Sequence, residues 1–273
     1  SPGPYLGFVG GLLRADDPRR AGLYVTTLED LARCPWRALL VDLLRVEAPR
    51  DPRGALPEID GALLGETAHR SLERLVGVSS SRPRGASWRV RRPGQGALDS
   101  AVTAAAEAVA KERGLRWPGL RRALAQRSLP LVQRAIELDW PHAGAEVQLV
   151  GAEEGRKLTV SDSEGRPRTL RFKVDRVDIH GGGLVLSDYK SGRPPSLGKR
   201  AETRRRQLRG AIARGERLQV AAYAAISRGA VGRYVFLDPS LPPEVAVARL
   251  EEKDPAVQRT LPRVLRDLME AWE

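Results

Sequence analysis

Residues 168–190, RTLRFKVDRVDIHGGGLVLSDYK, decide the fold of this chain. Apolar and polar residues alternate over 168–179 and again over 183–190, which is the period of two expected for half-buried strands. Three glycines at 181–183 stand between the two runs and allow a tight turn. The stretch therefore predicts two antiparallel strands joined as a hairpin.

Charged residues gather at the end of this hairpin that lies away from the glycines. Asp188 and Lys190 share a face of the second strand, because strand side chains repeat every second residue, and the hairpin brings Asp175 beside them. Such a group at an apolar edge is costly unless something pairs it. A hard divalent cation such as magnesium would pair it, make a bound water more acidic and neutralise phosphate charge. For Asp-x-Lys taken alone, a surface ion pair is the alternative.

The remaining periodicity predicts helices and further strands around the hairpin. Residues 25–45 have a helical rhythm that Pro35 breaks, and residues 79–96 are predicted to be an exposed loop. Helices are expected over 61–76, 98–113, 119–139 (kinked or split at Pro130), 200–214, 217–229 and 255–272, and strands over 145–150, 156–161 and 232–237. The order predicts an α/β fold with α+β character, in which helices flank a mixed central sheet built on the antiparallel hairpin.

The chain is expected to hold one folded domain after an irregular start. Residues 1–22 are rich in Gly and Pro and are predicted to be a lead-in, while residues 23–273 form a single domain, mainly helical over 23–140 and with the sheet core over 141–273. The sequence begins Ser-Pro-Gly without a Met, so we expect a fragment of a longer polypeptide. No apolar run reaches the ~20 residues of a membrane helix. The single cysteine, Cys34, excludes an internal disulfide and fits a reducing cytoplasm.

The charge of the chain is basic and local. Lys and Arg number 46 against 34 Asp and Glu, and nearly all of the excess lies in 82–92 and 199–217. Two basic patches on a near-neutral body indicate a polyanionic partner such as nucleic acid, although solvated loop and helix surface is the alternative. Trp88 in the first patch could stack on a base or anchor its loop. Arg204 and Arg205 in the second are candidates to line the path of DNA.

Four short segments resemble the RecB-like branch of the PD-(D/E)XK nuclease superfamily and occur in the family order. GETAH at 65–69 is similar to its Gly-x-x-x-His helix, and VDRVD at 174–178 to its Asp-Arg-Ile-Asp strand. DYKSG at 188–192 is similar to its Asp-Tyr-Lys-Thr/Ser-Gly motif, and QVAAY at 219–223 to its Gln-x-x-x-Tyr helix. The resemblance implies a restriction-endonuclease-like fold and metal-dependent hydrolysis of phosphodiester bonds.

The resemblance extends upstream, with YVTTLE at 24–29 followed by CPWR at 34–37, and PYLG at 4–7 before them. These segments are similar to the entry of the nuclease domain in AddB-type helicase–nuclease subunits, which implies helicase domains in the same chain or a partner subunit. The AddB and CRISPR-adaptation branches hold an iron–sulfur cluster on one early and three late cysteines. This chain keeps only Cys34, so we expect no such cluster. Phe172 replaces a glycine common in the family, which could close the site slightly or reflect strand packing.

The resemblance also implies the residues of a metal site. The side chains of His69, Asp175 and Asp188 would bind magnesium or manganese, and the backbone carbonyl of Tyr189 would complete the protein ligands. Lys190 would be the catalytic lysine, acting beside the two aspartates. The lysine would hold the attacking water or stabilise charge on the phosphorus.

Residues around this site have implied supporting roles. Gln219 and Tyr223, at i and i+4 on one helix face, would order the site or hold the DNA backbone, with a packed helix pair as the alternative. Arg176 would orient a carboxylate or contact phosphate. Glu146 begins the first predicted strand and could reach the site. The other two histidines, His142 and His180, are expected on the surface.

The sequence therefore predicts a magnesium- or manganese-dependent DNA nuclease domain, acting on single-stranded DNA in DNA end processing, repair or recombination. Two alternatives stay open. One is an inert DNA-binding or scaffold module with the nuclease fold, which the intact set of His, Asp, Asp and Lys argues against. The other is a stand-alone RecB-like exonuclease outside any helicase complex.

Overall fold

The computed structural model describes residues 23–46, 58–77, 87–140 and 142–272. Within them, seven strands form one mixed sheet in the order β2-β3-β4-β5-β6-β7, and β1 pairs with β4 beside this path. The strands are β1 Leu23–Tyr24, β2 Trp88–Arg91, β3 Glu146–Ser161, β4 Pro167–His180, β5 Gly183–Lys190, β6 Val231–Phe236 and β7 Val247–Glu251. Neighbours are antiparallel except for β5 with β6 and β1 with β4, which are parallel.

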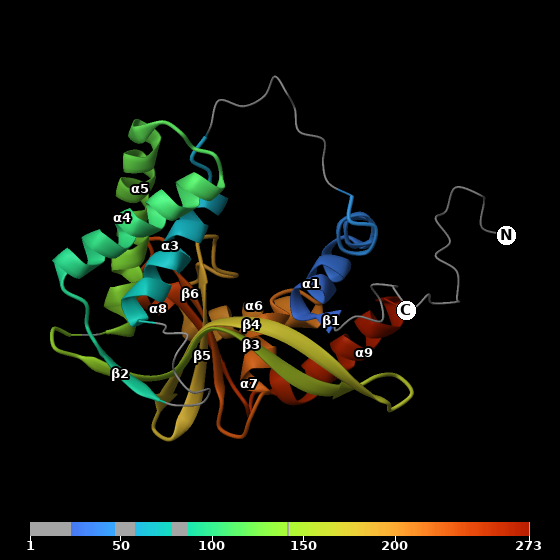
Figure 1. The fold of residues 1–273 in the computed structure, drawn as a ribbon. Coiled ribbons are helices and arrows are strands. Elements are labelled where there is room, and N and C mark those ends of the chain that lie inside the picture. Colours follow the sequence, from blue (N-terminus) through green and yellow to red (C-terminus); the bar gives the residue numbers. More distant parts are fainter. Residues whose placement is uncertain (1–22, 47–57, 78–86, 141, 273) are drawn as a thin grey trace.

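Helices cover both faces of the sheet (Figure 1). A bundle on one face consists of α3 Gly61–Val76, α4 Gln95–Glu112 and α5 Pro118–Asp139. The other face carries α1 Val25–Arg33, α6 Ala201–Ala213, α7 Leu218–Ala224 and α9 Leu261–Trp272. The shorter elements are α2 Pro35–Arg37, α8 Pro243–Ala246 and the π-helical turns η2 Ala38–Leu43 and η3 Ala256–Thr260. No described helix is long and apolar enough to cross a membrane.

Two cores, one on each face, hold these layers together. The core under α1, α6, α7 and α9 contains Leu28, Leu186, Ile212, Tyr223 and Tyr234. The core under the bundle contains Leu72, Val102, Ile136, Trp140 and Leu149. A smaller apolar cluster joins the three helices of the bundle to one another. The sheet is thus covered by helices on both faces, with a separate core under each layer.

The central hairpin forms as its sequence predicts. Gly181 and Gly182 have φ of +56° and +81°, which glycine adopts without steric cost, and they make the turn between β4 and β5. Pairing runs from His180 with Gly183 to Arg176 with Ser187. Beyond that pair β5 continues only alongside β6. A fork therefore opens between β4 and β5 just where the charged residues of the hairpin lie.

Three strands differ from the sequence expectation. β3 is one continuous strand with a register shift between Leu149 and Gly151, where two separate strands were expected, because the irregularity interrupts the alternation. β2 lies inside the expected loop over 79–96, and its Arg91 forms an ion pair with Glu146 of β3 at 2.7 Å. The short edge strand β7 was missed. The expectations for residues 1–22, and for the loop N-terminal to residue 87, lie outside the described residues.

The helices follow the predicted order with shifted ends. α5 runs through Pro130 without a break, although a proline inside a helix removes one backbone hydrogen bond. α7 ends at Ala224 rather than at residue 229, because the chain turns there to enter β6. The last predicted helix begins as the π-helical turn η3 and continues as α9.

Gly232 of β6 sets how closely α7 lies on the sheet. A Cβ at this position would stand 2.0 Å from the Val220 carbonyl oxygen and 2.9 Å from the Tyr223 Cβ. Both contacts belong to α7, and one is backbone that cannot move aside cheaply. The absence of a side chain at Gly232 is therefore a condition for the position of α7.

We expect Gly232→Ala to lower the free energy of unfolding by about 1–3 kcal/mol, because overpacking forces α7 away from β6. Gly155→Ala in β3 is the matched control, since a Cβ there meets nothing within 4 Å. Urea denaturation of both variants measures the difference. Equal stability of the two variants would contradict this account of the α7–β6 contact.

Candidate functional site

The fork between β4 and β5 collects the charged residues of the hairpin. Asp175 lies next to Arg176, where the pairing of β4 with β5 ends. Its Oδ2 accepts a hydrogen bond of 2.7 Å from the backbone N–H of Tyr189. A side chain thus satisfies an amide beyond the end of backbone pairing. Asp188 and Lys190 flank Tyr189 on β5, and Lys190 Nζ lies 2.7 Å from Asp188 Oδ2. The aspartates and the lysine are brought together as the sequence predicts.

Helix α3 brings His69 to the same place. Gly65 lies one helical turn earlier, and a Cβ there would stand 2.9 Å from Ser191 Oγ, so the glycine lets α3 approach the end of β5. One turn on, His69 Nε2 donates to the Tyr189 carbonyl oxygen at 2.9 Å. His69 Nδ1 faces Asp175 Oδ2 at 3.4 Å. The Gly-x-x-x-His spacing therefore has a direct structural reason.

Glu153 of β3 completes a group that the sequence analysis missed. Its Oε1 lies 3.9 Å from His69 Nδ1, and its Oε2 lies 2.5 Å from Lys173 Nζ. Ligand atoms of His69, Glu153 and Asp175 all lie within 4.8 Å of one another. Glu153 has a φ of +53° next to the irregular part of β3, and its position is unpaired in the register with β4. The only sequence signal was the loss of alternation in GAEEG at 151–155.

Glu146 was expected to reach the site, and this expectation is wrong. Its carboxylate pairs with Arg91 at 2.7 Å and lies 3.9 Å from Arg89. The residue begins β3, whereas the site lies further along the strand, beside Glu153.

His142 and His180 are exposed as expected. Phe172 is buried and its ring packs 5.2 Å from that of Tyr223, which favours strand packing as the reason for its presence.

Helix α7 supports the site from the other face of the sheet. Gln219 is buried, and its Oε1 accepts a hydrogen bond of 3.1 Å from Lys190 Nζ. One turn on, the Tyr223 hydroxyl contacts Asp188 Oδ1 at 3.2 Å and donates to the Lys173 carbonyl oxygen at 2.7 Å. Gln219 thereby holds the lysine and Tyr223 holds the aspartate. The two members of the Gln-x-x-x-Tyr segment act on different groups of the same site.

Burial and the crowding of carboxylates shift the pKa values of three residues at the site. Burial works against a charged imidazole, but Asp175, with Asp188 and Glu153, raises the pKa of His69 to about 9. Burial and the charge of Asp175 raise the pKa of Asp188 to about 6, against the pull of Lys190. Burial likewise raises the pKa of Glu153. Below about pH 9, His69 is therefore a cation surrounded by carboxylates.

These residues fit a divalent metal ion. One imidazole and nearby carboxylate oxygens are a donor set for hard cations, and a backbone carbonyl stands beside them. Asp188 Oδ2 is buried, and its charged neighbour is the Lys190 ammonium at 2.7 Å. The proton of His69 supplies positive charge where a bound ion would supply it. A metal ion would then replace this proton.

On the opposite face, a buried ion cluster holds the ring of Tyr189. The Tyr189 hydroxyl donates to Asp139 at the end of α5, and Arg176 donates to the same carboxylate at 2.8 Å. Arg176 also binds Asp178 at 2.8 Å, and Arg233 binds Asp139 at 2.6 Å. The side chain of Arg176 is 2% exposed. Of its two expected roles, this geometry favours the orientation of a carboxylate over a phosphate contact.

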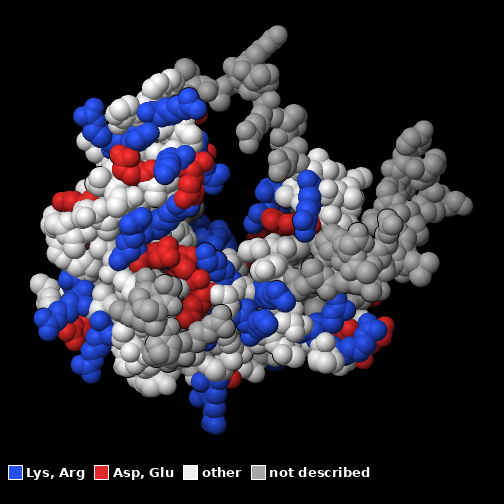
Figure 2. Space-filling model, in the orientation of Figure 1, with Lys and Arg blue, Asp and Glu red and all other residues white. Residues whose placement is uncertain are grey.

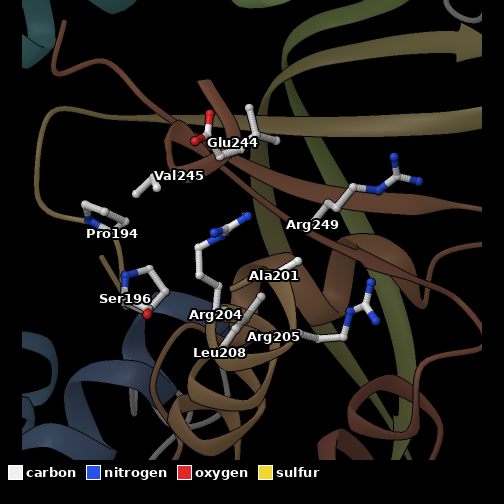
Figure 3. A pocket seen from close by; sticks show the side chains of 12 residues that line it. Pro194, Ser196, Ala201, Arg204, Arg205, Leu208, Glu244, Val245 and Arg249 are labelled. Atoms are coloured by element: carbon white, nitrogen blue, oxygen red, sulfur yellow. The ribbon is translucent and has the colours of Figure 1, made fainter. Parts of the chain in front are cut away.

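The residues expected to contact nucleic acid lie in different settings. Trp88 Nε1 donates to the Val76 carbonyl oxygen at 2.9 Å and its ring packs on the core, which favours its alternative role as an anchor of its segment. Arg204 and Arg205 line a cavity of about 230 Å³ together with Arg249 (Figure 3). Arg204 donates to the carbonyl oxygens of residues 198 and 199, which places its side chain over the loop that follows β5.

Acidic and basic side chains are unevenly distributed over the surface of the protein. Figure 2 shows a group of acidic side chains at the foot of the helical bundle, with basic side chains on several sides of it and smaller acidic groups elsewhere. A cation bound among the carboxylates would leave a positively framed surface. Such a surface attracts polyanions and releases them as salt increases.

The comparison with protein families assigns the chain. The model of the PD-(D/E)XK nuclease superfamily matches residues 23–273, so the chain belongs to this superfamily. The mixed seven-stranded sheet flanked by helices is consistent with its restriction-endonuclease-like fold, and its nucleases typically depend on a divalent metal. No curated protein matches the sequence significantly. The crystal structure of SSO0001 is similar at 13% identity and a TM-score of 0.30, over 77% of this chain and 84% of that chain.

We expect Mn²⁺ binding to the metal-free protein to release about one proton per ion at about pH 7.5. His69, with a pKa of about 9, must lose its proton to become a ligand, so binding should strengthen as the pH rises from about 6.5 to 9. Titration calorimetry in two buffers of different ionisation enthalpy measures the proton count. His69→Gln should bind more weakly and release no such proton, while exposed His180→Gln should match the wild type. Binding without proton release would contradict the assignment of His69.

Asp139→Asn should lower the free energy of unfolding by about 3 kcal/mol, because it removes one of the two carboxylates that balance the buried charges of Arg176 and Arg233 and leaves only Asp178. Asp267→Asn in α9 is the matched control, because its pair with Arg263 at 3.9 Å is exposed on both sides and contributes below about 1 kcal/mol. Urea denaturation compares the two. A similar loss in both variants would show that the buried cluster has no special weight.

Proposed function

We propose that residues 23–273 form a single nuclease domain that hydrolyses phosphodiester bonds of DNA with a bound magnesium or manganese ion. The observation that carries the proposal is the meeting of His69, Glu153 and Asp175 at the fork where Asp188 and Lys190 end β5. Carboxylates, an imidazole and a lysine at a fork between two strands match the needs of metal-assisted phosphate chemistry.

Each residue of the fork has a distinct task in this proposal. His69, Asp175, Asp188 and the Tyr189 carbonyl hold the ion, and Glu153 is a further candidate ligand. The bound ion supplies positive charge to the phosphate and makes a water more acidic. Lys190 stabilises the negative charge that develops on the phosphate oxygens, because its ammonium lies at the fork, 2.7 Å from Asp188 Oδ2.

The substrate in this proposal is single-stranded DNA, held mainly through its phosphates. Support comes from Arg204 and Arg205 beside the loop that leaves β5, and from basic side chains around the group of acidic side chains in Figure 2. Phosphate contacts of this kind do not depend on sequence and weaken as salt rises. Trp88 is not needed as a stacking platform in this proposal.

We further propose that the domain serves a helicase–nuclease in DNA end processing, repair or recombination in the cytoplasm. The AddB-like segments at 24–29 and 34–37 support this context, since they form α1 and the turn into α2 at the edge of the nuclease core. The partner would be a helicase domain of the same chain or of another subunit. No iron–sulfur cluster is part of this proposal, because the sequence holds one cysteine.

Asp188→Ala and Lys190→Ala should each lower the rate of cleavage of labelled single-stranded DNA about 100-fold or more in Mg²⁺ or Mn²⁺. Asp267→Ala and Lys157→Ala are the controls, because they remove the same charges at exposed positions away from the fork. Gel-based rates at saturating metal measure the effect.

Cleavage by both fork variants at the wild-type rate would refute the site. A wild-type protein that binds DNA but neither binds metal nor cleaves would instead be the scaffold module. Cleavage by the isolated chain at a rate that no helicase partner alters would favour a stand-alone exonuclease.

A further inference from the structure

Glu29 of α1 touches the site from a part of the chain that lies outside the four motifs. Val25, Leu28 and Leu31 bury one side of α1 in the core. The carboxylate of Glu29 leaves the helix toward α7, where Oε1 accepts a hydrogen bond of 3.0 Å from the backbone N–H of Gln219. The two residues are 190 positions apart in the sequence.

The start of α7 needs this acceptor. The first N–H groups of a helix have no partner within the helix, and a side chain at the N-cap position usually provides one. The residue before α7 is Arg217, which has a φ of +55° and provides no side-chain cap. Val220 N–H donates to the Tyr234 hydroxyl at 3.3 Å, and Gln219 N–H donates to Glu29. Side chains from α1 and β6 thus cap the helix.

The capped residue is the one that holds Lys190. The backbone N–H of Gln219 donates to Glu29, and its side-chain Oε1 accepts the hydrogen bond from Lys190 Nζ at 3.1 Å. Burial raises the pKa of Glu29, while the Gln219 amide and the positive charges of Lys190 and Arg217 oppose that rise. The carboxylate is thus held at the first turn of α7 by a hydrogen bond, with the charges of Lys190 and Arg217 close enough to act on it.

We propose that Glu29 is a positioning residue for Lys190, because it fixes the first turn of α7 and so holds Gln219 against the ammonium group. Helix α1 is then part of the support of the active site as well as part of the core. The inference rests on the proposed nuclease function, within which it adds a residue that touches neither the metal ligands nor the substrate.

The test combines substitutions at both ends of this contact. Glu29→Ala should lower kcat for a single-stranded oligonucleotide about tenfold with less than about a twofold change in KM, because binding of DNA is untouched. Glu29→Gln keeps an Oε1 acceptor and should bring kcat to within about threefold of the wild type. Asp30→Asn, on the same helix, is the control and should leave kcat unchanged, because the Asp30 carboxylate pairs with Arg33 at 3.4 Å.

A double-mutant cycle separates positioning from general stability. Gln219→Ala should lower kcat to a similar degree, and Glu29→Ala added to it should cause little further loss, because both act through one contact. Independent, multiplicative losses would overturn the proposal. A Glu29→Ala variant with lowered Tm but wild-type kcat well below its Tm would also overturn it, since the residue would then be structural only.

Hydrogen exchange makes failure of this inference distinguishable from failure of the proposed function. The Gln219 amide should lose protection in Glu29→Ala and keep it in Glu29→Gln, whether or not the chain cleaves DNA. If the wild type cleaves and protection is unchanged, only the role of Glu29 is refuted. If the wild type does not cleave, the nuclease proposal and the positioning of a catalytic lysine both fall, while loss of protection still establishes the cap.

Discussion

Backbone pairing between β4 and β5 ends at Arg176 and Ser187, and the rest of the site depends on that end. β5 continues beside β6, so a fork opens in the middle of a sheet that is otherwise covered on both faces. The Tyr189 amide at the fork finds the Asp175 carboxylate instead of a strand, which fixes one acidic group. The Tyr189 carbonyl finds His69, which fixes the imidazole. The main chain of one residue thus orders two side chains.

The fork concentrates negative charge, which the metal-free protein balances with only a few positive side chains. A proton on His69 and the ammonium groups of Lys173 and Lys190 offset the nearby carboxylates. The carboxylates raise the pKa of His69, while burial and then the charge of Asp175 raise the pKa of Asp188. The carboxylates of the site keep the His69 imidazole protonated, and the same negative charge favours a divalent cation. The electrostatics and the geometry therefore favour the same ligand.

Two independent supports hold β5 in place from opposite faces. Under the bundle, the Tyr189 ring is fixed by Asp139 and by the arginines around it. On the other face, α7 rests on Gly232 and places its side chains on Asp188 and Lys190. The buried ion cluster costs desolvation energy, so its value is specificity of position more than net stability. The result is a short strand whose alternate side chains are held by different cores.

The sequence by itself determined the hairpin, the helices of the bundle and the meeting of Asp175, Asp188 and Lys190, because the period of two and the glycine turn are local properties of the chain. Its motifs also placed His69 and the Gln219–Tyr223 helix face. Only the tertiary structure decided that Glu153 rather than Glu146 reaches the fork, since a register irregularity in β3 leaves no clear local pattern. It alone turned Arg176 and Trp88 inward and joined Glu29 to Gln219, because such contacts depend on which distant elements pack together.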